Sequence, residues 1–268
     1  MRVKPRTGRI LLARRARLPK QALRTCRALR TCLALRTCLV LATCIGGIVC
    51  GLVLASCGSK TSTRVLFIGN SFTYFNNGIN KELARLAPSS RTSIIAPGGY
   101  GLAMHWNEGK ARQAIRTGHY AYVVLQEQSQ TPVINQAMFR EYARDFAQEI
   151  KRSGAQTILL MTWERPDSVI AGVTTANLAA AYNAVGTELG VKVAPAGLAF
   201  ASALAERPDL VLYGPDGHPT TYGTYLAACV VYGTIFGRSP VGISYADKGI
   251  SSDQRDFLQR IAAQSLGY

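Results

Sequence analysis

Short apolar runs alternate with helical segments from Arg64 to the end of the chain, and this alternation constrains the fold more than any other feature. Each run is four to six residues long, which suits a strand that is buried on both faces of a sheet. The predicted strands are residues 65–68, 92–96, 120–125, 157–161 and 191–194.

The segments between and after these runs predict helices. The clearest one, at 135–152, places Phe139, Phe146 and Ile150 on one face at helical spacing. Strands that alternate with helices indicate a parallel sheet between two helical layers. We therefore predict an α/β fold: a flavodoxin-like three-layer α/β/α sandwich with a mostly parallel five-stranded sheet, in one domain at 64–268. The predicted helices are 78–86, 108–116, 135–152, 174–189, 198–205, 220–236 and 253–265.

The first 57 residues differ in composition from the predicted domain. They hold twelve Lys or Arg and no Asp or Glu, and Ala-Leu-Arg-Thr-Cys recurs at 22–26, 28–32 and 34–38. The whole chain has a formal charge of +16, but residues 58–268 hold 19 Lys and Arg against 15 Asp and Glu, or +4. Because a nucleic-acid binder concentrates positive charge in its folded domain, we expect no nucleic-acid partner.

An apolar stretch at 39–55 follows the arginines and ends at Leu54-Ala55-Ser56-Cys57. A basic region, an apolar region and small residues, in this order, predict a secretory signal. The last four residues resemble a bacterial lipobox, in which the cysteine is lipidated and becomes the new N-terminus. A transmembrane anchor is the alternative, because the stretch nearly reaches the length that spans a bilayer.

These features predict a basic leader with a lipoprotein-type signal peptide at 1–57, a short tether at 58–63 and one folded domain at 64–268. With lipidation at Cys57, the protein would be held by the membrane of a bacterial cell envelope. The domain would then face the periplasm or the exterior.

Six of the seven cysteines lie in the leader, mostly six residues apart, which is not a zinc-ligand spacing. Cys229 alone lies in the predicted domain, inside an apolar helix, where a small buried hydrophobe is the expected role. With so few cysteines and three histidines in the chain, we expect neither a metal site nor a cofactor.

Polar or glycine-rich segments follow the first three predicted strands. They read GNSFT at 69–73, GGYG at 98–101 and QEQSQ at 126–130. In open α/β sheets, ligands bind beyond the carboxyl ends of the strands. The sequence therefore predicts a functional site at this edge of the sheet.

The three histidines are His105, His119 and His218. His119 precedes the third predicted strand, away from the expected site, and we interpret His105 as structural or as a pocket wall. His218 lies two residues after Asp216 in a turn that contains Gly and Pro. A serine hydrolase needs a base near the hydroxyl and a third group that orients the base, and this turn can present both.

In combination and in order, these segments resemble the SGNH/GDSL hydrolase superfamily, which implies that 64–268 is an SGNH-type hydrolase domain. The matching blocks are Gly69-Asn70-Ser71, Gly98-Gly99, a polar amide after the third strand, and Asp216 with His218-Pro219, within about residues 64–240. More narrowly, the chain resembles an uncharacterised branch with the motifs GNSFT, PGGY, LQEQS and DGHP…GTYLAA. The G-x-S-x-G elbow of α/β-hydrolases is absent around Ser71.

This resemblance implies that Ser71 is the nucleophile, His218 its base and Asp216 the residue that orients His218. It implies an oxyanion hole formed by the N–H groups of Ser71 and Gly99, with Gly98 as the fallback, and by the side-chain amide of Gln128. Two departures stand out: Gln128 replaces the usual asparagine, and the usual acid lies three residues before the histidine, whereas Asp216 lies two before it.

The expected activity is that of an extracytoplasmic serine esterase that hydrolyses carboxylic esters, with acylated carbohydrate as the preferred substrate class. The alternative is a non-catalytic surface lipoprotein that binds glycan in the same cleft. Glu127 is either a carboxylate that supports the site or a solvated loop charge. Several aromatic residues near the predicted strand ends are either walls of a sugar site or packing residues: Tyr74, Phe75, Tyr100, Trp106 and Trp163.

Overall fold

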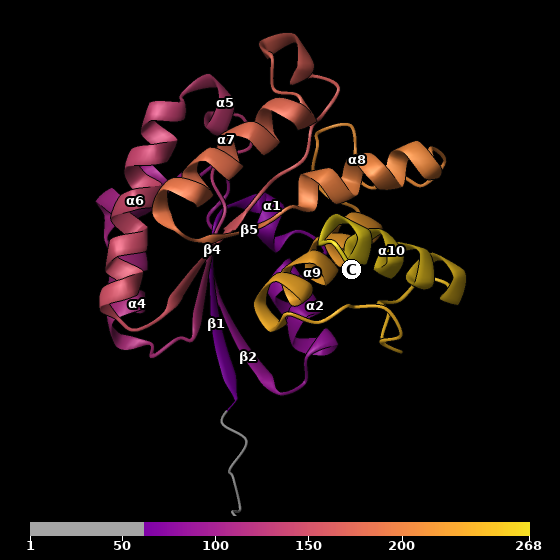
Figure 1. Cartoon of the computed structure of the whole chain (residues 1–268), viewed down its shortest axis with the longest axis horizontal. Coiled ribbons are helices and arrows are strands. Elements are labelled where there is room, and N and C mark those ends of the chain that lie inside the picture. Colours follow the sequence, from indigo (N-terminus) through magenta and orange to yellow (C-terminus); the bar gives the residue numbers. More distant parts are fainter. Residues whose placement is uncertain (1–61) are drawn as a thin grey trace, which may run out of the picture. The chain divides into compact units, whose positions relative to one another are not determined.

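Five parallel strands form one open sheet in the order β2-β1-β3-β4-β5 (Figure 1). The computed structural model describes residues 62–268; the predicted leader, Cys57 and most of the tether lie outside the described residues. The predicted parallel five-stranded α/β sandwich is confirmed. The strands are β1 (Thr63–Ile68), β2 (Ser90–Ile95), β3 (Tyr122–Leu125), β4 (Gln156–Leu160) and β5 (Lys192–Ala194).

The register of the central strands brings three loops together. Ile68, the last residue of β1, pairs with Ile95, the last residue of β2, and with Leu125, the last residue of β3. The segments that follow β1, β2 and β3 therefore leave the sheet at the same level. Because β2 lies on one side of β1 and β3 on the other, this is also the point where the strand order reverses, which is where ligands bind in such sheets.

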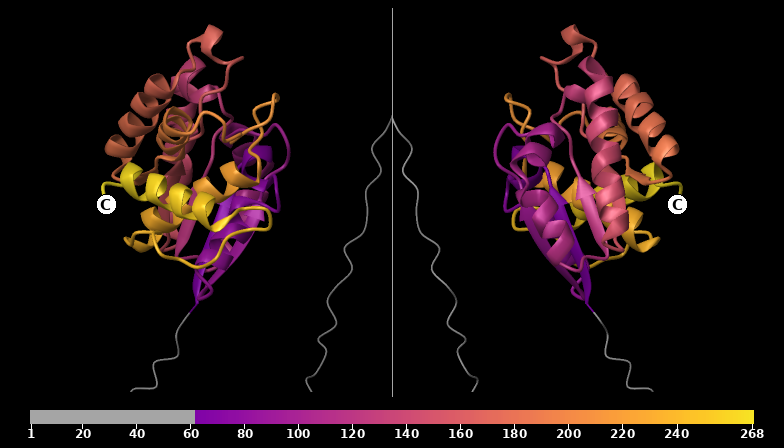
Figure 2. Two further views of the ribbon diagram at one scale, coloured as in Figure 1. Left: turned by 90° about the vertical axis from the view of Figure 1, so that its right-hand side faces the viewer. Right: turned by 90° about the vertical axis from the view of Figure 1, so that its left-hand side faces the viewer.

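Helices cover both faces of the sheet (Figures 1 and 2). Val65 and Phe67 of β1 face one layer, while Leu66 and Ile68 face the other, as the two-residue period of a strand requires. The first layer contains α2 (Ile79–Leu86), α8 (Ala196–Glu206), α9 (Thr221–Phe236) and α10 (Ser252–Ser265). The second contains α3 (Leu102–Glu108), α4 (Lys110–Thr117), α6 (Gln136–Arg152) and α7 (Thr175–Leu189).

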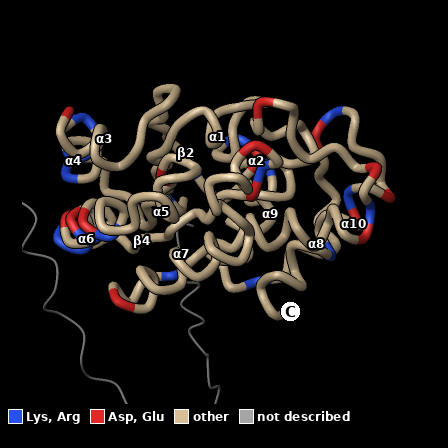
Figure 3. Tube along the Cα trace, turned by 90° about the horizontal axis from the view of Figure 1, so that it is seen from above, with Lys and Arg blue, Asp and Glu red and all other residues tan. Residues whose placement is uncertain are grey.

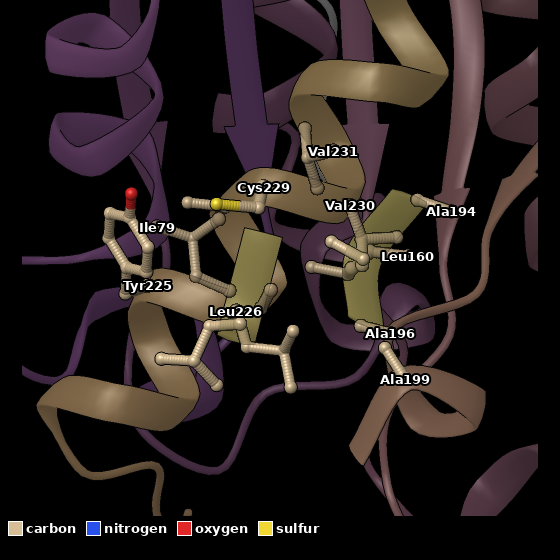
Figure 4. Close-up of a cluster of buried hydrophobic side chains, with 14 of the residues drawn as sticks. Ile79, Leu160, Ala194, Ala196, Ala199, Tyr225, Leu226, Cys229, Val230 and Val231 are labelled. Atoms are coloured by element: carbon tan, nitrogen blue, oxygen red, sulfur yellow. The ribbon is translucent and has the colours of Figure 1, made fainter. Parts of the chain in front are cut away.

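The helix α9 is apolar on every side and is buried on every side. It packs against α2, α8, α10 and the sheet, and Figure 4 shows its side chains Leu226, Cys229 and Val230 within this core. A helix without a polar face needs such complete cover. Cys229 is fully buried, as the sequence predicts for a small hydrophobe.

The remaining differences from the predicted elements are local. The predicted helix at 108–116 corresponds to α4, which begins two residues later because Gly109 adopts a left-handed conformation between α3 and α4. Four short helices were not predicted: α1 (Ser71–Tyr74), α3, α5 (Thr131–Ile134) and the 3-10 helix η1 (Val169–Ala171). Such short elements carry no detectable hydrophobic period.

Lys, Arg, Asp and Glu are interspersed on the outer helices. Blue and red segments alternate along α6 and α10 in the view from above (Figure 3). Among residues 62–268, no helix has both the length and the apolar character that a membrane span needs.

Candidate active site

Ser71 is the first residue of α1, directly beyond the end of β1. Asn70 caps this helix: its backbone is extended, and its side-chain Oδ1 accepts the N–H of Phe72 at 3.1 Å. An asparagine is a favoured residue at this position because it satisfies a free N–H of the first turn. The serine is thereby held half-exposed at the carboxyl edge of the sheet.

Hydrogen bonds to Gln126, the first residue after β3, hold the turn that carries Ser71. The Oε1 atom of Gln126 accepts the N–H of Asn70 at 2.9 Å and the hydroxyl of Thr73 at 2.8 Å. Gln126 is buried, so these bonds are shielded from water. The loop after β3 therefore fixes the start of α1.

The glycine loop after β2 is tied to the same turn. Asn70 donates from Nδ2 to the carbonyl of Tyr100 at 2.8 Å. Gly99 has a φ of +76°, and a Cβ built there would meet no atom within 4 Å, so this part of the loop is open. One residue, Asn70, thus joins the Ser71 turn to the segment that contains Gly98 and Gly99.

Gln128 presents its amide group in one orientation. Its Oε1 accepts the backbone N–H of Gln130 at 2.9 Å, the N–H of Thr131 at 3.1 Å and the hydroxyl of Thr131 at 3.2 Å. With the oxygen occupied at the start of α5, the Nε2 donors are left without a partner among the described residues. The side chain can therefore donate to a ligand.

His218 and Asp216 form a hydrogen-bonded pair. His218 Nδ1 lies 2.8 Å from Asp216 Oδ2, and the His218 backbone N–H donates to Asp216 Oδ1 at 3.2 Å. The hydrogen bond from the imidazole lowers the pKa of Asp216. The two-residue spacing thus allows the carboxylate to reach the ring, although the Asp216 side chain remains 65% exposed.

The loop that carries this pair is anchored by residues that follow β4. Trp163 donates from Nε1 to the carbonyl of Gly217 at 3.1 Å, and Arg165 donates to the carbonyl of Asp216 at 3.4 Å. Trp163 is itself clamped between the rings of Phe72 and Phe200, whose centroids lie 5.1 Å and 4.2 Å away. The position of His218 is therefore set by a buried aromatic stack.

His218 lies against the helix that begins with Ser71. Its ring stacks on Phe75 with 3.9 Å between the centroids, and it meets the edge of Phe72 at 5.3 Å. Asn76 also donates to the carbonyl of Pro219 at 2.5 Å. Within residues 62–268, no hydrogen bond joins Ser71 to His218. The structure therefore places the two residues on neighbouring segments, α1 and the loop packed against it, without direct hydrogen bonding between their side chains.

Of the other two histidines, His105 is structural. His105 is buried and bonds from Nε2 to the carbonyl of Gly69 at 2.7 Å; burial lowers its pKa. His119 precedes β3 at its amino end, on the far side of the sheet from Ser71. In the described part of the chain, no three His, Cys, Asp or Glu side chains are grouped as a metal site requires.

The aromatic residues separate into two groups. Trp163 is buried, and Trp106 packs edge-on against Phe146 with 5.1 Å between the centroids, so both are packing residues. Tyr74 remains 44% exposed, and Tyr100 is half-buried. Tyr74 and Tyr100 keep exposed surface at this edge, although Tyr74 stacks on Phe75 and Tyr100 meets the ring of His105 edge-on.

Glu127 is 1% exposed, so the interpretation as a solvated loop charge is wrong. Sequence reasoning also missed the supporting roles of Asn70, Gln126 and Trp163. Each lies within three residues of the end of a strand, and this position was the one signal in the sequence that pointed to them. Their hydrogen-bond partners lie 30 to 56 residues away in the chain, and no local pattern reports such pairs.

A hollow of about 590 Å³ lies elsewhere, between α6 and α7. Gln156, Thr157 and Lys192 line it, and these residues start β4 and β5. It therefore opens at the amino edge of the sheet, opposite Ser71, and it is separate from the predicted site.

Several solved structures have a fold similar to that of this chain. A protein from Slackia heliotrinireducens that is provisionally assigned as an SGNH hydrolase is 26% identical, with a TM-score of 0.59 over 65% of this chain and 99% of that one. A DUF4886 family protein from Bacteroides uniformis superposes with a TM-score of 0.62 over 77% of this chain and 95% of that one, at 17% identity.

An acetyl xylan esterase, AlAXEase, has the same fold at 12% identity, with a TM-score of 0.52 over 65% of this chain and all (100%) of that one. No family model and no curated protein sequence matches the chain. The fold search nevertheless confirms the predicted resemblance to the SGNH/GDSL superfamily.

Proposed function

We propose that this chain, which has the fold of the SGNH/GDSL hydrolases, is a serine esterase that hydrolyses carboxylic esters. The observation that carries the proposal is the His218–Asp216 pair, held against the helix that Ser71 begins. The three strand-end loops supply the remaining groups that ester hydrolysis needs.

In this mechanism Ser71 is the nucleophile and His218 is the general base. Asp216 holds the Nδ1–H of His218, which leaves Nε2 as the nitrogen that can accept a proton. Nε2 takes the hydroxyl proton as Ser71 Oγ attacks the ester carbonyl, and the imidazolium then protonates the leaving alcohol. Water, deprotonated by His218, releases the acyl group. The Ser71–His218 hydrogen bond forms when substrate binds, since such bonds are often long in free enzymes.

The oxyanion of the tetrahedral intermediate is stabilised by three donors in this proposal. They are the backbone N–H groups of Ser71 and Gly99 and the Nε2 group of Gln128. The fixed Oε1 of Gln128 supports this role, because it determines which way the amide points. Loss of one such donor typically lowers the rate by about 10²–10³.

Acylated carbohydrate is our proposed substrate class. Tyr74 and Tyr100 support it, because exposed aromatic rings beside a hydrolytic serine can stack on the apolar face of a sugar. The interspersed charge of the outer helices (Figure 3) agrees with a neutral substrate rather than nucleic acid. One solved protein of the same fold is described as an acetyl xylan esterase.

The leader supports an extracytoplasmic location. We propose that the chain is lipidated at Cys57 and held by the membrane of a bacterial cell envelope, with the hydrolase domain facing the periplasm or the exterior. Mass spectrometry of the N-terminal peptide from a bacterial host tests this proposal. A peptide that starts at an acylated Cys57 supports it, and a peptide that retains residue 56 contradicts it.

A non-catalytic glycan-binding lipoprotein is the second candidate. The absence of a Ser71–His218 hydrogen bond within the described residues favours it. The two functions differ in the effect of one substitution. Binding that survives Ser71→Ala, without turnover by the wild type, supports the binding protein.

Hydrolysis of p-nitrophenyl acetate by the wild-type chain, Ser71→Ala and His218→Ala tests the proposal. Because members of a triad act as one unit, both variants should lose activity by at least about a thousandfold. Wild-type turnover equal to that of both variants would contradict a generic esterase. Acetylated xylan, assayed through released acetate, then tests the preferred substrate class separately.

A further inference from the structure

Glu127 lies between two of the loops that supply the proposed oxyanion donors. It follows Gln126 in the segment after β3, and its side chain points toward the start of α3. It is 1% exposed, and within residues 62–268 no Lys or Arg forms an ion pair with it. A buried carboxylate without a cation needs another set of donors.

Backbone N–H groups supply those donors. Glu127 Oε1 accepts the N–H of Gln128 at 2.7 Å and the N–H of Leu102 at 3.1 Å, while Oε2 lies 3.3 Å from the same Leu102 nitrogen. Leu102 is the first residue of α3, and this helix has no side-chain cap of its own from Gly101. From the segment after β3, Glu127 therefore caps the N-terminus of α3, which follows a different strand.

The fit is close enough to require a glycine at position 101. A Cβ built on Gly101 would lie 2.4 Å from Glu127 Oε1, so any larger residue there would displace the carboxylate from its present position. On the other side of Gly101, the carbonyl of Tyr100 is held by Asn70. The peptide groups that flank Gly101 are thus fixed from both sides, two residues after Gly99.

We infer that Glu127 is a positioning residue that fixes both loop-borne oxyanion donors, Gly99 and Gln128, through the N–H groups of Leu102 and Gln128. This role rests on the proposed esterase function. Glu127 does not touch the substrate. It aligns two donors that come from different strands, so a single carboxylate sets the distance between them.

The surroundings of Glu127 support this role over simple packing. From α7, Tyr182 faces it: burial first, and then the charge of Glu127, raise the pKa of Tyr182. On α3, His105 is occupied with the carbonyl of Gly69. Burial raises the pKa of Glu127 to about 7, opposed by the Gln128 and Leu102 N–H bonds. The two backbone N–H bonds therefore oppose the effect of burial on this carboxyl group, which is more than simple packing of the side chain would provide.

Glu82 provides a matched control. It is also 1% exposed, and burial raises its pKa, but it lies on α2 and bonds to Arg85 and Tyr245. Substitution of either glutamate removes a buried carboxylate. Only the substitution of Glu127 should disturb the oxyanion loops.

Two readouts on the whole chain in detergent test the inference. Hydrogen exchange followed by mass spectrometry should show faster exchange at 98–104 and 126–131 in Glu127→Ala, and wild-type exchange there in Glu82→Ala. In p-nitrophenyl acetate hydrolysis, Glu127→Ala should lower kcat about 10²-fold with little change in KM, because the donors act in the transition state. Glu127→Gln should restore most of kcat, since its Oε1 can still accept both N–H groups.

Wild-type exchange of both loops in Glu127→Ala would overturn the inference, as would an equal fall of kcat in Glu82→Ala. A change confined to KM would also overturn it. If the wild type shows no Ser71-dependent turnover, the proposed function fails, and the exchange comparison alone then decides whether Glu127 positions the loops.

Discussion

The indole Nε1–H of Trp163 donates to the carbonyl of Gly217 at 3.1 Å, so a residue after β4 holds the loop that presents His218. Trp163 is buried in an aromatic stack with Phe72 and Phe200. Phe72 is next to Ser71 in α1. The same stack therefore sets the position of the proposed nucleophile and of the proposed base.

Trp163→Phe should weaken this link while it preserves most of the stacking. The Gly217 carbonyl loses its donor, and the smaller ring leaves a gap, which together should cost about 1–3 kcal/mol in the free energy of unfolding. We also expect kcat for p-nitrophenyl acetate to fall about tenfold, because small misplacements of catalytic groups are costly. Urea unfolding and steady-state kinetics measure the two effects; an unchanged kcat would show that His218 is positioned without Trp163.

Asp216→Asn should lower kcat, because the amide no longer holds the Nδ1–H tautomer of His218. The loss should be about 10–10³-fold, smaller than the ~10⁴-fold loss for a buried triad aspartate, since water reaches the exposed Asp216 and can partly replace it. Asp167→Asn is the control. Asp167 is a similarly exposed carboxylate that lies 3.4 Å from Arg165 and does not contact His218. Equal activity of both variants would remove Asp216 from the mechanism.

Alanine substitutions distinguish Gly99 from Gly98 as the oxyanion donor. Gly99 has a φ of +76°, so Gly99→Ala should strain the loop by about 1–2 kcal/mol and displace its N–H. A Cβ on Gly98 would lie at an ordinary 3.5 Å from the hydroxyl of Tyr74. We expect kcat to fall at least about tenfold in Gly99→Ala and to change little in Gly98→Ala. The reverse pattern would assign the donor to Gly98.

The raised pKa of Glu127 predicts a pH dependence of stability. The folded chain holds this proton up to pH about 7, whereas the unfolded chain releases it near the ordinary value of 4.5. The contribution of Glu127 to the free energy of unfolding is therefore fully present below about pH 4.5 and is lost as the pH rises through about 7. Relative to Glu127→Gln, the wild type should lose about 2–4 kcal/mol across this range.

Urea unfolding of the wild type and Glu127→Gln at about pH 4.5 and about pH 8 measures this difference. The comparison cancels the titration of other groups, such as Glu82 and Asp216, that the two chains share. A difference that stays constant with pH would mean that Glu127 keeps an ordinary pKa in the folded chain.

Much of the fold follows from local patterns. All five strands were predicted within two residues at each end, since a buried strand is an apolar run wherever it lies. The predicted helix at 108–116 matches α4, but the preceding helix α3 was missed, and Gly109 separates the two. The helix α1 has four residues and no period, so only its cap, Asn70, marks it in the sequence.

The sequence by itself determined the layers of the sandwich, which loops lie at its carboxyl edge and the residue types with which those loops can do chemistry. Apolar periods and strand-end glycines are local signals, and they need no knowledge of distant contacts. Only the tertiary structure decided that Glu127 is buried and that Trp163 holds the loop of His218. Each of these depends on a partner more than twenty residues away, 25 for Leu102 and 54 for Gly217. Such pairs arise from strand register and helix packing, which no short stretch of sequence specifies.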